Sequence, residues 1–139
     1  METYVHKIQY YETDKMGITH HSNYIRWMEE ARTDFLKQIG WDYDKLELAG
    51  IFSPVTAIDC RFRRSTTYPD EIRITVRVAE YKGPVLKIAY EMTDQSGKKV
   101  FEGFSEHCFL NREGKLIRLA RENPAFHETL LTLAGRTEA

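Results

Sequence analysis

Five segments of the chain alternate between hydrophobic and polar positions, and this pattern predicts five β-strands. The later segments are joined by short turns such as DQSGK, so we expect them to pair as antiparallel neighbours. The alternation also indicates a sheet with one buried face and one polar face. In the second segment the expected inward positions are Ile58, Cys60 and Phe62. The five segments are residues 4–11, 55–64, 71–80, 85–93 and 99–110.

The strongest helical pattern covers residues 22–39, where apolar residues recur every three or four positions. Its apolar face is broad and includes Trp27, so we expect this helix to be deeply packed. A shorter amphipathic piece covers residues 42–50, and Asn123 followed by Pro124 marks the start of a C-terminal helix. Only the helix at 22–39 is long and apolar enough to cover the sheet. The pattern therefore predicts an α+β fold, with an antiparallel sheet wrapped around one long central helix.

The composition is that of one globular domain over residues 1–139. The formal net charge is −1, which gives no sign of a nucleic-acid partner. The N-terminal stretch is polar, unlike a signal peptide, and no apolar run is long enough to span a bilayer. We therefore expect a cytoplasmic protein with no membrane partner. Cys60 and Cys108 form no CxxC pair, so we expect two buried thiols rather than a disulfide or a zinc site.

Candidate chemistry concentrates in TDKMGITHHSNYIRW, residues 13–27, where a carboxylate and a glycine precede the long helix. A helix N-terminus carries unpaired N–H groups and a partial positive charge, so it can polarise a carbonyl oxygen that is becoming an oxyanion. Gly17 permits a tight turn before the helix begins near His21 or Ser22, which leaves Asp14 across that turn. A carboxylate that faces a polarised carbonyl suits acyl transfer, with Asp14 as base or nucleophile.

Two other interpretations of this stretch remain open. Aspartate is common in turns for purely local reasons, so Asp14 is also explained as a solvated turn or capping residue. A metal site would use Asp14, His20 and His21. However, adjacent histidines point in different directions, and no HExxH motif is present. A polar or capping role is therefore favoured for the two histidine side chains.

The same stretch resembles the signature of the 4-hydroxybenzoyl-CoA thioesterase family. Thr19 and Lys7 depart from the usual residues of the signature, but both lie outside the reacting pair. The order and lengths of the elements resemble the family over nearly the whole chain, which implies a single hotdog domain at residues 1–139. The positions in register with the signature are Thr13, Asp14, Gly17, Ile18, His20, Asn23 and Tyr24. Similarity to the bacterial branch of the family extends to His21, Glu30, Ala31, Arg32 and Thr33.

The resemblance implies an acyl-CoA thioesterase that releases a carboxylic acid and coenzyme A. Asp14 would be the catalytic carboxylate, as nucleophile or general base, and the backbone N–H of His21 would polarise the thioester carbonyl. This chemistry needs no metal or redox cofactor. Members of the family associate as dimers, often paired into homotetramers, with active sites between subunits. The substrate-binding surroundings of the reacting pair would include Gly17, His20, Asn23 and Tyr24.

Coenzyme A brings phosphate groups, for which the chain offers several exposed basic candidates. Solvated charge on strands and loops is nevertheless the simpler interpretation of these residues. His107, on the last strand, is interpreted as a packed or surface histidine rather than a catalytic one. The basic candidates are Arg61, Arg63, Arg64 and Lys82.

Other functions would share parts of this pattern. A non-catalytic acyl-CoA binding module would share the fold, because fold does not fix function. A thioesterase acting on acyl carrier protein would share the chemistry. A hotdog hydratase or dehydratase is disfavoured, because its arrangement of catalytic histidine and acid is not found. We also expect at least a homodimer, with the regular strands at 71–80 and 85–93 as the motive for a sheet that continues across the interface.

Overall fold

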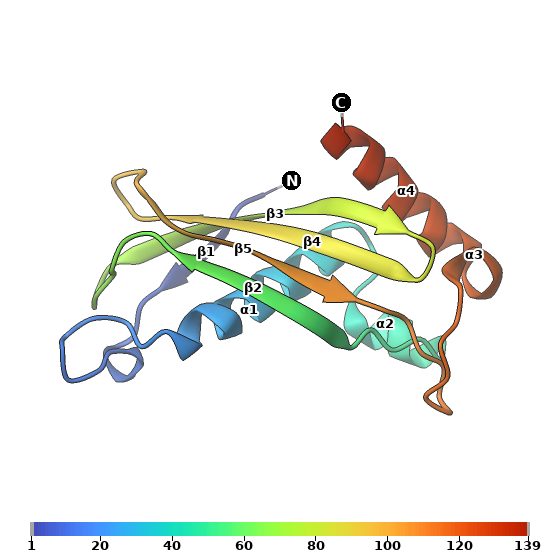
Figure 1. Cartoon of the computed structure of the whole chain (residues 1–139), viewed down its shortest axis with the longest axis horizontal. Coiled ribbons are helices and arrows are strands. Elements are labelled where there is room, and N and C mark those ends of the chain that lie inside the picture. The colour runs from blue at the N-terminus through green and yellow to red at the C-terminus, as the bar shows by residue number, and fades with distance from the viewer. Residues whose placement is uncertain (1, 139) are drawn as a thin grey trace.

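The computed structural model describes the backbone of residues 2–138 and the side chains of residues 2–135. The sheet lies across helix α1, with the loop before α1 at one end of the molecule and α2, α3 and α4 at the other (Figure 1). Within the described residues, no helix is long and apolar enough to cross a membrane. The elements are β1 (Tyr4–Lys7), the 3-10 helix η1 (Tyr10–Glu12), α1 (Ser22–Gln38), α2 (Tyr43–Leu48), β2 (Val55–Phe62), β3 (Glu71–Lys82), β4 (Val85–Thr93), β5 (Lys99–His107), α3 (Leu119–Glu122) and α4 (Pro124–Glu138).

The strands form one five-stranded sheet in the order β1-β3-β4-β5-β2, and every neighbouring pair is antiparallel. Strands β3, β4 and β5 follow one another through short turns, which confirms the predicted pairing. Strand β2 lies at the far edge against β5, with Phe62 opposite Phe101. The predicted α+β class is confirmed.

The predicted strand at 4–11 is too long, because β1 ends at Lys7. The chain then turns into η1, where the Glu12 N–H donates to the Gln9 carbonyl at 3.0 Å. The Glu12 carboxylate completes this turn by accepting the Gln9 N–H at 2.7 Å. These local hydrogen bonds compete with the strand ladder, which the loose alternation of the sequence did not reveal.

The predicted strand at 99–110 is also too long, because β5 ends at His107. Leu110 forms only isolated bridges, to Phe52 and to Leu116. The short helix α3 that follows was not predicted. Its four residues are too few to produce a helical period in the sequence.

Helix α1 provides the centre of the core, as predicted. Trp27 and Met28 are almost completely buried, and Phe35 lies about two turns further along the same face. Full burial of one such side chain is worth about 1.5–3 kcal/mol relative to exposure, so this face fixes the helix against the sheet.

The prediction that a single helix covers the sheet is incomplete, because α4 also packs against β3. The reason is length. Seventeen residues of α1 span about 25 Å, whereas twelve residues of β3 span about 40 Å. Phe126 and Leu130 of α4 belong to the same buried cluster as α1. The predicted helix start is confirmed, since Asn123 Oδ1 accepts the Phe126 N–H at 3.2 Å and Pro124 is the first helical residue.

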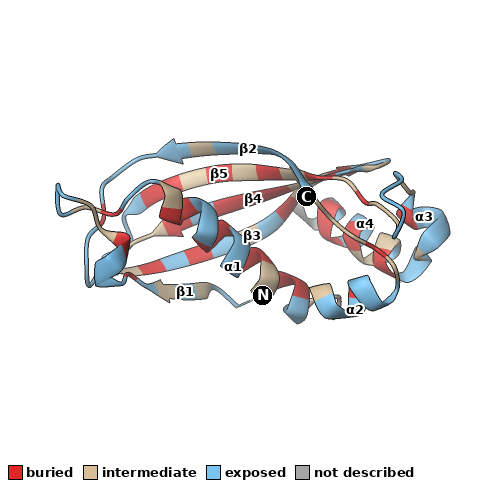
Figure 2. Cartoon of the chain, turned by 90° about the horizontal axis from the view of Figure 1, so that it is seen from below, coloured by how far each residue is buried: buried red, intermediate tan, exposed pale blue. Residues whose placement is uncertain are grey.

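Strand β2 is exposed along almost its whole length, on both of its faces (Figure 2). The expectation that Ile58, Cys60 and Phe62 are buried is therefore wrong for the single chain: Ile58 is 40% and Phe62 51% exposed, and Cys60 is half-buried. The sequence alternation is real, but among the described residues the inner face of β2 is covered only at its end, where the Phe62 ring lies 5.3 Å from that of Tyr24 in α1. The outer edge of β2 is also unpaired within the chain.

The regular strands at 71–80 and 85–93 are not edges. They form β3 and β4, which lie inside the sheet with a neighbour on each side. Strand β4 is paired along both edges, so it cannot extend the sheet across an interface. Strand β3 pairs with β1 only over Glu71–Ile74, and within the described residues Thr75–Lys82 has no strand partner on that side, so its part in a dimer stays a prediction. The outermost strands of the described sheet are β1 and β2.

A chain of buried hydrogen bonds ties α1 to β4 and β5. Arg32, only 7% exposed, donates to the Tyr90 hydroxyl at 3.0 Å. The Tyr90 hydroxyl is 2.6 Å from Ser105 Oγ, which is 2.8 Å from His107 Nε2. The guanidinium can only donate, so the Tyr90 oxygen accepts its proton, and these distances are compatible with Tyr90 donating to Ser105 and Ser105 donating to Nε2 of a neutral His107. This places His107 in the packed interior, as predicted.

Burial, and to a lesser extent the charge of Arg32, lower the pKa of His107 from 6.5 to about 4, although the Ser53 backbone acts weakly in the opposite direction. Between about pH 6.5 and pH 4, His107 is therefore protonated in the unfolded chain but neutral in the folded chain. This contribution to stability is constant above about pH 6.5 and is lost progressively as the pH falls towards 4.

We expect this linkage to cost about 2 kcal/mol of unfolding free energy between pH 7.5 and pH 5. The change His107→Gln keeps an acceptor for Ser105 but cannot take up the proton. Urea unfolding of both proteins at pH 5, 6 and 7.5 measures the effect. The variant should lose about 2 kcal/mol less than the wild type over this range. Parallel stability curves for the two proteins would contradict the assignment.

Candidate active site

Asp14 opens a tight turn that holds it by three hydrogen bonds. The Asp14 N–H donates to Ile18 O, the Gly17 N–H donates to Asp14 O, and Asp14 Oδ1 accepts the Met16 N–H at 2.8 Å. Gly17 has a φ of +77°, in the left-handed region that favours glycine. Among the described residues, none donates a hydrogen bond to Oδ2 of Asp14.

The same turn occurs twice more in the chain, beginning at Asp94 and at Asn111. Each has the same three hydrogen bonds and a glycine with positive φ at the fourth position. Since Asn111 does this work as well as an aspartate, the turn itself does not require a carboxylate. Any special role of Asp14 must therefore come from its surroundings.

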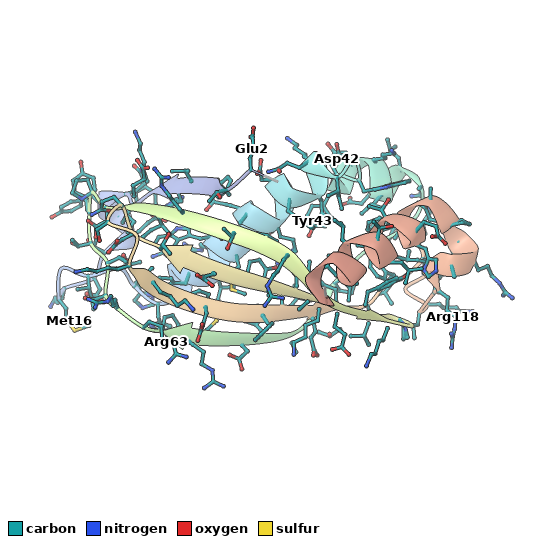
Figure 3. The ribbon with its side chains drawn as sticks, turned by 90° about the horizontal axis from the view of Figure 1, so that it is seen from above. Glu2, Met16, Asp42, Tyr43, Arg63 and Arg118 are labelled. Atoms are coloured by element: carbon teal, nitrogen blue, oxygen red, sulfur yellow. The ribbon has the colours of Figure 1, made fainter. Side chains whose placement is uncertain are left out.

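Those surroundings are fixed by the segment that leads into β3. The Thr19 N–H donates to Thr66 O at 2.8 Å, and the Thr67 hydroxyl donates to Gly17 O at 2.6 Å. An isolated bridge between Thr13 and Thr19 closes the base of the loop. The Asp14 turn is thus held at both ends. In the view of Figure 3, Met16 of this turn lies toward the same end of the molecule as Arg63, opposite Arg118.

At the start of α1, one backbone N–H group has no acceptor among the described residues. The His20 N–H donates to Glu12 O, the Asn23 N–H to His20 O, and the Tyr24 N–H to His21 O. The Ser22 N–H donates to Nδ1 of His20 at 3.2 Å, so the His20 side chain acts as a cap. In the part of the chain that the structure describes, the backbone N–H of His21 has no acceptor.

An unsatisfied N–H at a helix N-terminus is a site for a carbonyl oxygen or an anion. The His21 side chain is exposed; its ring stacks on that of His20 at 4.3 Å. The sequence prediction singled out the backbone of residue 21 rather than its imidazole. The accounting of donors at the helix start is consistent with that choice.

Asp14 lines a cleft of about 430 Å³. Two exposed tyrosines of this cleft were missed by the sequence prediction: Tyr10 and Tyr68, whose rings meet edge to face at 5.9 Å. They come from η1 and from the loop before β3, so only the folded chain brings them together. The cleft is lined by Tyr10, Thr13, Asp14, Lys15, Gly17, Thr67 and Tyr68.

Asn23 and Tyr24 lie beneath this loop rather than on its surface. Asn23 is 5% exposed and donates its amide to the Glu12 carbonyl at 2.9 Å. Tyr24 is 4% exposed; its ring stacks on Phe101, and its hydroxyl is 2.9 Å from Thr66 Oγ1. In the single chain both residues support the loop from below, and their predicted contact with substrate stays a prediction.

The candidate phosphate contacts fall into two groups. Arg61 pairs with Asp59, Arg63 with Glu102, and Lys82 with Glu80. Arg64 is exposed, just beyond the end of β2, and its side chain has no acceptor among the described residues. Its backbone N–H is anchored to the Val100 carbonyl at 3.2 Å.

Among the described residues, the cysteines and the acidic side chains form neither a disulfide nor a candidate metal site. Both cysteines are half-buried rather than buried as expected, and neither forms a disulfide. Burial, with the neighbouring Asp59 carboxylate, raises the pKa of the Cys60 thiol, which disfavours the thiolate. Over the described residues, no three His, Cys, Asp or Glu side chains are grouped so that they could hold a metal ion.

The chain belongs to the thioesterase-like superfamily, whose family model matches residues 8–131. The predicted hotdog class and the assignment to thioester hydrolases are thereby confirmed at the level of the family. YneP of Bacillus subtilis strain 168, which carries the provisional name of an acyl-CoA thioesterase, is 30% identical over 122 residues, covering 87% of this chain and 88% of YneP. A 1,4-dihydroxy-2-naphthoyl-CoA hydrolase of Thermosynechococcus vestitus is 23% identical over 79% of this chain and 76% of its own length.

Solved structures agree with this assignment. A DHNA-CoA thioesterase from Staphylococcus aureus superposes with a TM-score of 0.93 at 31% identity, covering 98% of this chain and 92% of that one. A hypothetical protein from Aquifex aeolicus superposes with a TM-score of 0.86 at 28% identity, covering 94% of this chain and 99% of that one. The fold therefore matches hotdog thioesterase structures over almost all of its length.

Proposed function

We propose that this chain is an acyl-CoA thioesterase that hydrolyses a thioester to a free carboxylic acid and coenzyme A. The observation that carries the proposal is that one loop, residues 14–21, holds both a backbone N–H without an acceptor, at His21, and a carboxylate with an oxygen that accepts no hydrogen bond from the described residues, at Asp14. One group suits a developing oxyanion and the other suits attack or proton removal. The names of YneP and of the S. aureus DHNA-CoA thioesterase support a CoA thioester as substrate.

In this proposal the thioester carbonyl oxygen accepts the His21 N–H. Asp14 then acts in one of two balanced ways. As a base, it takes a proton from water while the hydroxide attacks the carbonyl carbon and the C–S bond breaks. As a nucleophile, Oδ2 attacks the carbon itself, releases the CoA thiolate, and leaves an anhydride that water hydrolyses. Either route uses charge and position alone.

Coenzyme A phosphates would be met by Arg64 rather than by all three arginines of this region. Arg61 and Arg63 already face carboxylates, which lowers their net attraction for an anion. Arg64 is exposed, lacks such a partner among the described side chains, and follows the strand that ends near the start of α1. Its backbone anchor to Val100 holds it near the site.

We further propose that two copies of the chain pair through β2. Its inner face carries the exposed Ile58 and Phe62, and its outer edge has free backbone groups, so a second copy would satisfy both. Association would also enclose the site near Phe62, whose ring lies 6.4 Å from that of His21. Pairing of dimers into a tetramer stays a prediction.

The first test is Asp14→Asn, which removes the charge but keeps the turn, as Asn111 shows. We expect hydrolysis of acyl-CoA thioesters to fall by about 10²-fold or more, as for loss of a positioned base. Asp94→Asn is the matched control, because it makes the same change in a turn with the same three hydrogen bonds, to which the Ser96 hydroxyl and the Lys98 N–H add two more. Turnover by the Asp14 variant within a factor of about two of the wild type would refute the assignment.

A panel of acyl-CoA and acyl carrier protein thioesters, assayed with the wild type, identifies the substrate class. Hydrolysis of the carrier-protein thioesters alone would replace coenzyme A in the proposal. Binding of acyl-CoA without hydrolysis of any member would instead show a binding module.

The second test separates the backbone of residue 21 from its imidazole. His21→Ala keeps the N–H and should retain substantial activity. His21→Pro removes it, and should cost roughly 10²–10³ in rate, as for loss of one oxyanion donor. Proline fits the observed φ of −56° at this position, and circular dichroism checks that α1 survives. An alanine variant as inactive as the proline variant would assign the role to the side chain.

The third test concerns the dimer. Light scattering should give twice the chain mass of 16.3 kDa at micromolar concentration. Ile58→Lys places a charge on the inner face of β2 and should shift the protein towards the monomer. Leu48→Lys is the control, since Leu48 is 82% exposed on α2 and away from β2. A monomeric wild type, or equal effects of the two lysines, would contradict the proposed interface.

A further inference from the structure

We infer that Glu12 is a positioning residue that holds the two halves of the proposed site in register. The inference rests on the proposed function, because the halves are the Asp14 carboxylate and the His21 N–H. Glu12 precedes Asp14 by two residues and is 5% exposed, so it cannot reach a bound substrate as a surface group. Nothing in the alternation of the sequence singled it out.

The Glu12 carboxylate joins three elements. Oε1 accepts a hydrogen bond from His6 Nε2 of β1 at 2.9 Å and from the Gln9 N–H at the start of η1 at 2.7 Å. Oε2 accepts from the indole N–H of Trp27, on the buried face of α1, at 2.8 Å. The side chain therefore fixes η1 between the edge of the sheet and the second turn of the helix.

The backbone of the same residue joins the loop to the helix start. The Glu12 carbonyl accepts the His20 N–H at 2.8 Å and the Asn23 side-chain amide at 2.9 Å. His20 immediately precedes the unsatisfied donor at His21. One residue thus sets where the chain leaves towards Asp14 and where it returns to begin α1, so movement of Glu12 would displace both reacting groups together.

The hydrogen bonds that His6, Gln9 and Trp27 donate to the Glu12 side chain, here called the Glu12 joint, require an ionised carboxylate. Burial opposes ionisation, but the hydrogen bonds from Gln9, His6 and Trp27 hold the pKa of Glu12 below its usual value. A glutamine has one acceptor oxygen and one NH₂ donor, whereas all three partners of this side chain donate. In either orientation of the amide, at least one donor would face another donor, and the joint would have to rearrange.

The test compares Glu12→Gln with Glu30→Gln. Glu30 contacts the same histidine from the other side, with its Oε2 at 3.5 Å from His6 Nδ1, but it is exposed and does not touch η1. We expect Glu12→Gln to lower kcat by about 10- to 100-fold with KM changed less than about 2-fold, because small misplacement of reacting groups affects the chemical step. Glu30→Gln should leave both constants within about 2-fold of the wild type.

Amide hydrogen exchange in residues 13–21 provides a readout that does not depend on activity. Exchange there should become faster in Glu12→Gln and stay unchanged in Glu30→Gln. Unchanged exchange in this loop, or an unchanged kcat in the Glu12 variant, would overturn the inference. A wild type that hydrolyses no thioester would defeat the proposed function, while the exchange comparison would still decide the positioning role.

If Glu12→Gln does not fold, Trp27→Phe tests the same hydrogen bond from the other side. It retains an aromatic ring in the core and removes the indole N–H that Oε2 accepts, together with the five-membered ring of a fully buried side chain. We expect the same pattern at smaller size, with kcat lowered several-fold and exchange in residues 13–21 faster. A folded Trp27 variant with wild-type kcat and wild-type exchange would likewise overturn the inference.

Discussion

The backbone donors at the start of α1 are the constraint around which this molecule is arranged. A helix must leave its first N–H groups without intrahelical partners, and those groups need acceptors unless a ligand supplies one. Here the Glu12 carbonyl, the His20 ring and two local carbonyls satisfy the neighbouring donors. The N–H of His21 alone, in the described part of the chain, is left without an acceptor. The deep burial of Trp27 fixes α1 against the sheet and so holds the N–H of His21 in place.

A second constraint is that one side of the sheet, at strand β2, is not covered by other described elements. Helix α1 is shorter than β3, so α4 packs against the far end of the sheet, but the described residues leave most of the inner face of β2 uncovered. The exposed Ile58 and Phe62 lie on the same side as the proposed site. A second copy placed there would bury apolar surface and exclude water from the reaction at the same time. Stability and catalysis would then favour the same association.

The elements with a long and clean period were predictable from the sequence. The period of 3.6 in α1 and the alternation of β3 and β4 reflect burial within one chain, which the sequence encodes directly. The end of β1 could not be read in this way, because a single buried carboxylate at Glu12 closes η1. Likewise, β2 shows the alternation of a buried strand and yet is exposed here, since alternation predicts an apolar face without showing what covers it.

The candidate site was predictable only where it is local. Asp14, Gly17 and the helix start lie within eight residues, so their spacing could be reasoned about directly. Tyr10 and Tyr68 meet across 58 positions of sequence, and Thr66 binds Thr19 from a distant loop. Such partners depend on how the sheet orders its strands, which no local pattern contains. The turn at Asp14 is also no signal by itself, because Asp94 and Asn111 form the same turn elsewhere.

The two acidic residues of the sequence Glu12-Thr13-Asp14 show how environment divides one chemical group into two tasks. Glu12 is buried and both of its side-chain oxygens accept hydrogen bonds, so its carboxylate holds three elements together. Asp14 uses one oxygen to close its own turn and leaves the other towards an open cleft. A carboxylate that is fully hydrogen-bonded is a poor base and a poor nucleophile, because reaction would break those bonds. Buried Glu12 is therefore suited to position half-buried Asp14, and Asp14 to react.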